Sequence, residues 1–333
     1  MAAPLIVGLA GHRLEPSERE FLAKVRPLGI IIFARNVASV EQVTELVAEA
    51  KAAAGADLAF VDQEGGRVQR LRPPLAPRYP PSRAVGDVHA ADPEAGKRAA
   101  WLQGRLIAAD LTPLGLDSPC LPVADVPAVG SNDVIGDRAY GSDPETVSDL
   151  AGAAAEGVLD GGALPVMKHI PGHGRAMADS HFALPAVDAS RENLAADFAP
   201  FSVLAALPMA MTAHVKYGAI DPERAATVSP AAIGLIRDHI GFDGFLMTDD
   251  ISMGALRGDI ATNARAALDA GCDCVLHCNG KMGEMEKIAE VLPPMAPEAA
   301  DRLARGLAVR RSPSEENLAD LRQEFANLLN VGP

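Results

Sequence analysis

Short apolar segments alternate with longer stretches of helical periodicity along the 333-residue chain. The short segments are β-branched or otherwise hydrophobic throughout, which is typical of strands buried on both faces of a parallel sheet. They predict eight strands, at residues 5–9, 30–34, 58–62, 118–123, 165–169, 209–214, 245–249 and 274–278.

The intervening segments carry helix signals. Residues 40–55 repeat apolar positions at i, i+4 and i+7 and end on Gly55. Two further helices are predicted to begin at Asp143 and Ser229, because each is a capping residue followed by proline. Strands alternating with helices predict an α/β fold, a TIM-type (β/α)8 barrel forming a single domain over residues 1–333, with an added C-terminal helix at residues 313–330. An open doubly wound sheet is the alternative, but the G-x-G-x-x-G nucleotide signal does not follow the first strand.

Composition narrows the classes of partner. The formal charge of −14, without a block of five like charges, argues against nucleic-acid binding. The sequence contains neither an apolar run of about 18 residues nor a convincing signal peptide, so we expect no membrane partner and a cytoplasmic location. Cys272, Cys274 and Cys278 would share one strand face but spread over about 20 Å, which predicts buried free thiols instead of a zinc site.

Ionisable side chains recur where the predicted strands end, and barrel enzymes place their chemistry at this edge. They are Asp62 and Glu64, Asp125, Lys168 and His169, His214, and Asp249 and Asp250. An aspartate at a buried strand end, kept ionised by nearby cations, is suited to nucleophilic attack on a sugar's anomeric carbon. Asp249 is the candidate for this role.

The segment KHIPGHGRAMADSH, residues 168–181, is the richest in chemistry. Gly172 and Gly174 make its backbone permissive, which predicts a mobile loop over residues 172–181. Asp179 and His181 are predicted to act as a dyad, because a carboxylate beside an imidazole raises its pKa and makes a proton shuttle near neutrality. Several histidines near acids also suggest a metal-dependent barrel hydrolase. Such sites usually begin with a paired H-x-H, whereas His12 stands alone, so we expect no metal ligands and no cofactor.

Seven motifs together resemble the β-N-acetylhexosaminidases of glycoside hydrolase family 3, in particular the single-domain bacterial cytoplasmic enzymes of peptidoglycan recycling. They are VDQEGGRVQRL, IGDRAYG, KHIPGHG, ADSH, HVKYGAIDPERAATVSP, GFDGFLMTDDISMGAL and DAGCDCVLHCN. The resemblance covers nearly the whole chain. Ile170 departs from the pattern, since the family usually has phenylalanine there.

The resemblance implies a role for each matching residue. Asp249 would be the nucleophile, and His181 the acid/base with Asp179 as its partner. The residues implied to hold the hydroxyls of an N-acetylglucosamine ring are Asp62, Arg70, Arg138, Lys168 and His169. On electrostatic grounds, Lys168 and Arg138 would also keep Asp249 ionised. The resemblance implies a structural role for Asp250, and from the residue itself we expect an aspartate that caps the next helix.

The implied enzyme is a retaining exo-β-N-acetylglucosaminidase, a monomer that acts on muropeptides of the GlcNAc-1,6-anhydroMurNAc type. Three alternatives stay open at this point. A β-glucosidase or a phosphorylase would use the same scaffold, the metal-dependent hydrolase would need other ligands, and a silent sugar-binding barrel would have lost Asp249 or His181, both of which are present.

Overall fold

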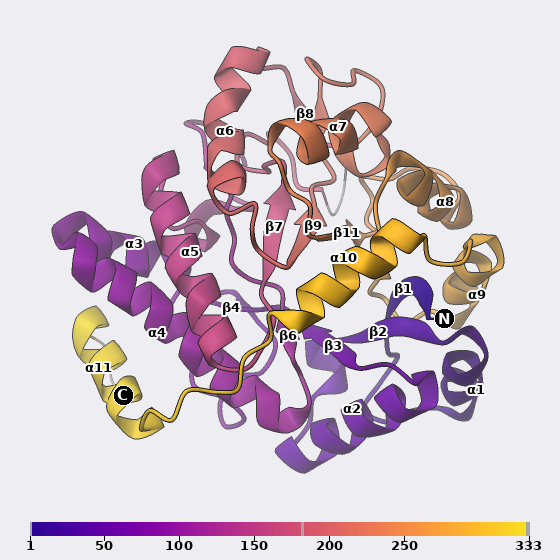
Figure 1. The fold of residues 1–333 in the computed structure, drawn as a ribbon, viewed down its shortest axis with the longest axis horizontal. Helices are drawn as coiled ribbons and strands as arrows, with labels where there is room; N and C mark the ends of the chain where they lie inside the picture. Colours follow the sequence, from indigo (N-terminus) through magenta and orange to yellow (C-terminus); the bar gives the residue numbers. More distant parts are fainter. Residues whose placement is uncertain (1, 181–182, 331–333) are drawn as a thin grey trace.

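The computed structural model describes residues 2–180 and 183–330 (Figure 1). Eight parallel strands form one sheet in the order β6-β3-β2-β1-β12-β11-β9-β7. Their bounds are β1 (Ala3–Gly8), β2 (Pro27–Ile32), β3 (Leu58–Val61), β6 (Ser118–Pro119), β7 (Val166–Ile170), β9 (Met209–Thr212), β11 (Phe245–Asp250) and β12 (Cys274–His277). The eight predicted strands are confirmed, although several begin or end at different residues.

The two outer strands of this order, β6 and β7, meet and close the barrel. The amide of Val166 donates to the carbonyl oxygen of Leu121 at 2.9 Å, and that of Lys168 to Pro122 at 3.0 Å. A parallel bridge joins Val123 to Lys168. The short β6 is therefore continued by further pairing, and the predicted (β/α)8 barrel is confirmed.

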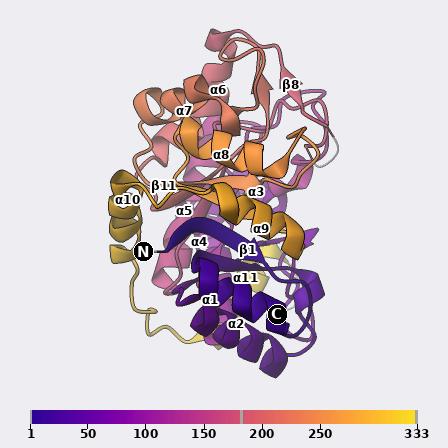
Figure 2. The same cartoon turned by 90° about the vertical axis from the view of Figure 1, so that its right-hand side faces the viewer.

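Helices surround the strands, as Figures 1 and 2 show. They are α1 (Pro16–Val25), α2 (Val40–Ala54), α3 (Ser82–Ala91), α4 (Pro93–Leu111), α5 (Pro144–Asp160), α6 (Arg191–Val203), α7 (Pro230–Gly234), α8 (Ile260–Ala270) and α9 (Met282–Val291). The predicted caps are confirmed: Asp143 accepts the amide of Thr146, Ser229 accepts that of Ala232, and Gly55 ends α2 with φ 62°. Helix α7 continues into a π-helical segment, Leu235–His239.

Alternation along each strand divides the core into two layers. Ile6, Ile31 and Phe60 pack in the barrel interior with Met247 and Leu276. Residues of the opposite parity, such as Leu5, Val7 and Ile30, pack against the helices, as the period of two requires.

A helix that was not predicted from the sequence, α10 (Pro297–Ala308), covers one end of the barrel, although Pro297 at its first position is a helix-start signal. Its Ala299 belongs to the interior layer, and its Arg302 pairs with Asp243 and Asp273, which precede strands β11 and β12. Helix α10 therefore covers the amino-terminal ends of the strands, on the side opposite β8 (Ala186–Val187) in Figure 2. The carboxyl ends are left open for a site.

The C-terminal helix α11 (Leu318–Leu329) packs on the outside of the barrel against α4. Arg98 of α4 pairs with Glu324 at 2.7 Å. The helix begins later than residue 313 because Asn317 is its cap and accepts the amide of Ala319.

All four cysteines are free and buried, which confirms the prediction made for Cys272, Cys274 and Cys278. Cys274 and Cys278 lie in the barrel interior, whereas Cys272 precedes β12 and packs in the outer layer. The prediction that all three thiols share one strand face is therefore wrong for Cys272. In residues 2–180 and 183–330, no helix combines the length and apolarity needed to cross a bilayer.

Candidate active site

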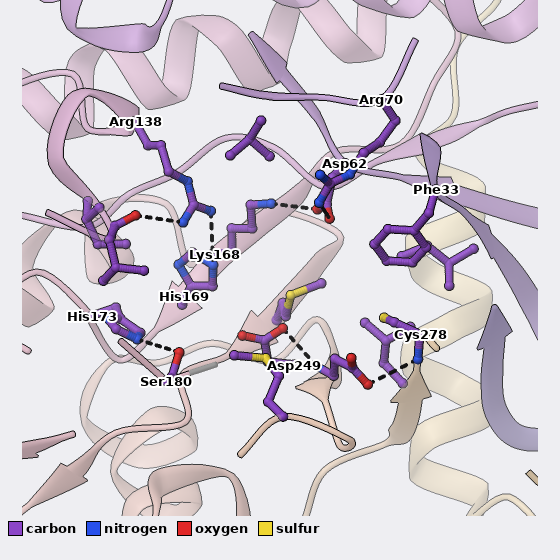
Figure 3. A pocket seen from close by; sticks show the side chains of 18 residues that line it. Phe33, Asp62, Arg70, Arg138, Lys168, His169, His173, Ser180, Asp249 and Cys278 are labelled. Carbon is purple, nitrogen blue, oxygen red and sulfur yellow. Dashed lines mark hydrogen bonds and ion pairs between the residues drawn. The ribbon is translucent and has the colours of Figure 1, made fainter. Parts of the chain in front are cut away.

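A pocket of about 130 Å³ opens among the carboxyl ends of the strands (Figure 3). It is smaller than the roughly 300–1,000 Å³ of sites for drug-sized ligands, which suits a ligand of one ring. Six residues predicted from the sequence line it together: Asp62, Arg70, Arg138, Lys168, His169 and Asp249.

Strand parity explains how the acids reach this pocket. Phe245 and Met247 point into the barrel interior, so Asp249, two residues further on, continues the same face at the open end. Phe60 and Asp62 are related in the same way on the third strand. The alternation that builds the core therefore also aims these carboxylates into the pocket.

Five buried or half-buried charges form an ionic cluster on one wall: Asp62, Glu64, Arg70, Arg138 and Lys168. The Lys168 side chain is 2% exposed, and its ammonium lies 2.9 Å from Asp62 Oδ1 and 2.5 Å from Glu64 Oε1. Arg70 donates to Asp62 Oδ2 at 2.8 Å. Arg138 donates to both oxygens of Glu64, each at 2.8 Å. Glu64 lies in β4 (Gln63–Gly65) and is a residue to which the sequence assigned no role.

The cluster keeps all of its members charged. Burial alone would raise the pKa of the Asp62 carboxyl, but Lys168 and Arg70 outweigh it and hold that pKa well below its usual range. Burial would likewise raise the pKa of Glu64, but the positive charges of Arg138 and Lys168 outweigh it and lower this pKa to about 2. The two carboxylates in turn raise the pKa of Lys168 despite burial. The wall therefore offers fixed donors and acceptors to the hydroxyl groups of a ligand.

Asp249 is also held ionised. Burial favours its neutral form, but the imidazoles of His214 and His169, the backbone N–H of Asp250 and the ammonium of Lys168 lower its pKa. The amide of Asp250 donates to Asp249 Oδ1 at 2.7 Å. His214, to which the sequence assigned no role, has its Nε2 2.9 Å from the carbonyl oxygen of Asp250.

This arrangement differs from the sequence prediction in one partner. Lys168 does act on Asp249, but less than the two imidazoles. Arg138 is bound at both oxygens of Glu64 instead.

Asp250 does not cap the next helix, contrary to the prediction. Its carboxylate accepts the amide and hydroxyl of Ser252 and the amide of Cys278. Helix α8 starts ten residues after Asp250, at Ile260, and is capped by Asp259. Asp250 thus joins the turn after β11 to the end of β12.

Asp125, a third residue without an assigned role, orients the histidine of the pocket. Its buried carboxylate lies 2.7 Å from His169 Nδ1 and accepts the backbone amide of His173 at 2.6 Å. Burial would raise the pKa of Asp125, but His169 outweighs it and lowers this pKa, so the carboxylate is ionised. The ionised carboxylate holds a proton on Nδ1 of His169. His169 Nε2 then lies 3.4 Å from a guanidinium nitrogen of Arg138, and Figure 3 shows the two side chains next to each other in the pocket.

The glycine-rich loop is described as far as Ser180. His173 Nε2 lies 3.1 Å from Ser180 Oγ. Burial, and to a lesser extent the neighbouring His169, lowers the pKa of His173 to about 4. Gly174 is a point of close packing, because a Cβ there would lie 1.9 Å from the carbonyl oxygen of Val126. His181 lies outside the described residues, so the Asp179–His181 dyad and the mobility of the loop stay predictions.

Metal ligation finds no support in the part of the chain that the structure describes. No group of three or more His, Cys, Asp or Glu side chains converges there. The histidines of the pocket instead have partners of other kinds, including Asp125 for His169 and Ser180 for His173.

A closed (β/α)8 barrel with an ionised aspartate and a wall of fixed charges at its open end defines an enzyme for a small polyhydroxylated ligand. The family model described as glycosyl hydrolase family 3 N terminal domain matches residues 5–303. The chain therefore belongs to glycosyl hydrolase family 3, and the prediction that it is a glycosidase is confirmed.

Individual relatives are similar to this protein over most of its length. A β-hexosaminidase of Idiomarina loihiensis is 39% identical over 321 residues, covering 95% of this chain and 96% of that protein. A β-hexosaminidase of Methylococcus capsulatus is 43% identical over 277 residues, 81% of each chain. The structure of NagZ from Neisseria gonorrhoeae in complex with N-trifluoroacetyl-D-glucosamine is similar, with a TM-score of 0.87, 32% identity, and coverage of 99% and 98%.

Proposed function

We propose that this protein is a retaining exo-β-N-acetylglucosaminidase that removes N-acetylglucosamine from muropeptides of the GlcNAc-1,6-anhydroMurNAc type, as a cytoplasmic monomer. The observation that carries the proposal is Asp249, kept ionised by its neighbours in a pocket sized for one sugar ring. The β-hexosaminidase relatives and the glucosamine derivative bound by NagZ support an N-acetylated sugar.

The chemistry needs a nucleophile and a proton donor. The Asp249 carboxylate attacks the anomeric carbon while the bond to the leaving oxygen breaks, and His181 gives that oxygen its proton. Water then attacks the glycosyl-enzyme ester, His181 accepts a proton from it, and Asp249 leaves as the carboxylate. The role of His181 and of its partner Asp179 follows from the family resemblance.

The ionic cluster holds the sugar. Asp62 has lone pairs left beyond its bonds to Lys168 and Arg70, and these accept hydroxyl protons. Lys168 retains a third N–H for donation. Below the pocket the barrel interior is filled by side chains such as Met211 and Leu276, so a glycan chain cannot pass through. That closed end supports removal of one terminal unit at a time.

Trapping of the intermediate tests the proposal. A 5-fluoro-N-acetylglucosaminyl fluoride should form an accumulating ester, because fluorine beside the ring oxygen slows an oxocarbenium-like transition state. We expect one added glycosyl mass, on the peptide that contains Asp249, and none in Asp249→Asn. A label on another residue would refute Asp249 as the nucleophile, and release of the inverted anomer, seen by proton NMR, would disprove the retaining mechanism.

The alternatives on the same scaffold need a second assay. Turnover of an aryl β-N-acetylglucosaminide should exceed that of the aryl β-glucoside, and the reverse preference would make the protein a β-glucosidase. A histidine donor repels an approaching anion less than a second carboxylate would, so phosphate is expected to compete with water. Analysis of products in phosphate buffer checks this, and absence of a sugar phosphate would contradict it.

A further inference from the structure

A second cavity, of about 680 Å³, lies behind the β4–β5 hairpin, where β5 is Val68–Gln69. Val68 and Arg70 line the active-site pocket, whereas Arg67 and Gln69 line this second cavity. The hairpin is therefore a wall shared by the two. We call the second cavity the basic hollow, because its charged lining consists of Arg67, Arg72, Arg78 and Asp137.

The local charge contrasts with the rest of the chain. Residues 65–86 contain five arginines and no aspartate or glutamate, in a protein with a formal charge of −14. Placing like charges together is unfavourable unless an anion compensates them. Concentrated positive charge on an acidic protein therefore points to an anionic ligand.

The arginines of the basic hollow differ in how many ion pairs and hydrogen bonds their guanidinium groups already make. Arg67 pairs with Asp137 and donates to carbonyl oxygens of the segment after residue 132. Within the described residues, Arg72 donates to the carbonyl oxygens of Gln69 and Arg67 and has no carboxylate partner. Arg78 is exposed and makes no hydrogen bond or ion pair with a described residue. Two guanidinium charges are thus uncompensated in this part of the structure.

We propose that Arg72 and Arg78 form an anion subsite that binds carboxylate groups of the substrate's aglycone. The inference rests on the proposed function, in which the aglycone carries a peptide. The active-site pocket has room for one ring, so the remainder of the substrate lies outside it, and the basic hollow adjoins that pocket across the shared hairpin. A guanidinium presents paired N–H donors that match a carboxylate, and the local positive charge counters the repulsion between two acidic molecules.

Arg78→Gln and the double variant Arg72→Gln/Arg78→Gln test the subsite. Two substrates are compared, the peptide-bearing GlcNAc-1,6-anhydroMurNAc and the neutral 4-nitrophenyl β-N-acetylglucosaminide. We expect the double variant to lose about 3- to 10-fold in kcat/KM on the acidic substrate through a higher KM, as befits two exposed charge contacts. Turnover of the neutral substrate should stay within about twofold.

Matched controls separate charge from local damage. Arg78→Lys keeps the charge and should retain most of the preference. Arg265→Gln removes an exposed arginine of α8, which lies across the barrel from α3 in Figure 1, and should affect neither substrate. On the acidic substrate, the ratio of kcat/KM between the parent and the double variant should fall as the salt concentration rises from about 0.05 to 0.5 M. Equal losses on both substrates, or none on either, would overturn the subsite.

A binding measurement keeps this inference separate from the proposed function. Peptide-bearing 1,6-anhydroMurNAc, which lacks the glycosidic bond to N-acetylglucosamine that the enzyme would cleave, is titrated into the parent and the double variant by calorimetry. Weaker binding to the variant supports the subsite even if the parent hydrolyses neither substrate, a result that would refute the proposed function alone. Identical titrations, or no binding to either protein, would refute the subsite.

Discussion

Replacing Glu64 with glutamine is the substitution whose cost follows most directly from the structure. The side chain is 3% exposed and lies between Lys168 and Arg138. Its pKa falls from 4.5 to about 2, and each pKa unit corresponds to about 1.4 kcal/mol. The charge on Glu64 therefore stabilises the fold by about 3 kcal/mol at neutral pH. Glutamine has nearly the same shape but no charge, so Glu64→Gln should lose about this amount.

The pH dependence has a defined sign. Because the folded-state pKa of Glu64 lies below the unfolded value, its stabilisation is present above pH 4.5 and is lost as the pH falls toward 2. The deficit of Glu64→Gln should shrink from about 3 kcal/mol at pH 7 to about 2 kcal/mol near pH 3.5. Urea denaturation of parent and variant at both pH values measures it.

The matched control is Glu49→Gln, which removes an exposed partner of Arg19 and should change the free energy of unfolding by less than about 0.5 kcal/mol. A Glu64→Gln variant as stable as the parent, or a deficit that does not change with pH, would refute the reasoning. The same variant should raise KM, because Arg138 loses the carboxylate that positions it.

Three further predictions concern the pocket and its loop. Asp249→Asn should lower kcat by more than about a thousandfold, some 4 kcal/mol of activation energy, and unchanged turnover of the aryl N-acetylglucosaminide would contradict its role. Asp125→Asn should lower kcat/KM by about 10- to 100-fold and move the pH profile, because His169 loses the acceptor that fixes its tautomer; an unmoved profile would leave Asp125 a packing role. Gly174→Ala should cost about 1–3 kcal/mol in chemical denaturation, since its Cβ would meet the carbonyl of Val126, while Gly234→Ala, with open space around it, should cost nothing; equal stabilities would refute the close approach.

The sequence predicted the barrel well because strand burial on both faces leaves a plain signal. The same parity predicted Asp62 and Asp249 at the open end, two residues beyond Phe60 and Met247. The role of Glu64 was not predicted because this residue lies on β4, a strand of three residues. Such a strand is too short for periodicity to show where a side chain points.

Other misses have a similar physical origin. The sequence placed Asp125 at a strand end, but its contact with His169 joins residues 44 positions apart, which no local pattern predicts. Helix α10 covers the amino-terminal ends of the strands, a tertiary placement that its own pattern does not encode. The sequence does contain the contrast between residues 65–86 and the acidic remainder, but the hairpin that shapes it into a hollow is seen only in the structure.

The electrostatics of the pocket give a reason for a histidine, and not a carboxylic acid, as proton donor in the proposed reaction. The pKa values of Asp62, Glu64, Asp125 and Asp249 are all lowered, since the surrounding Lys, Arg and His groups outweigh burial. A carboxylic acid serving as donor needs a raised pKa to hold its proton near neutrality, and this pocket lowers the pKa of such groups. The ordinary pKa of an imidazole is about 6.5, so a histidine holds a proton near neutrality without any rise in its pKa. A carboxylate partner such as Asp179 raises that pKa further. The charges that keep the nucleophile ionised thus favour a donor of another chemical type, carried on a separate loop.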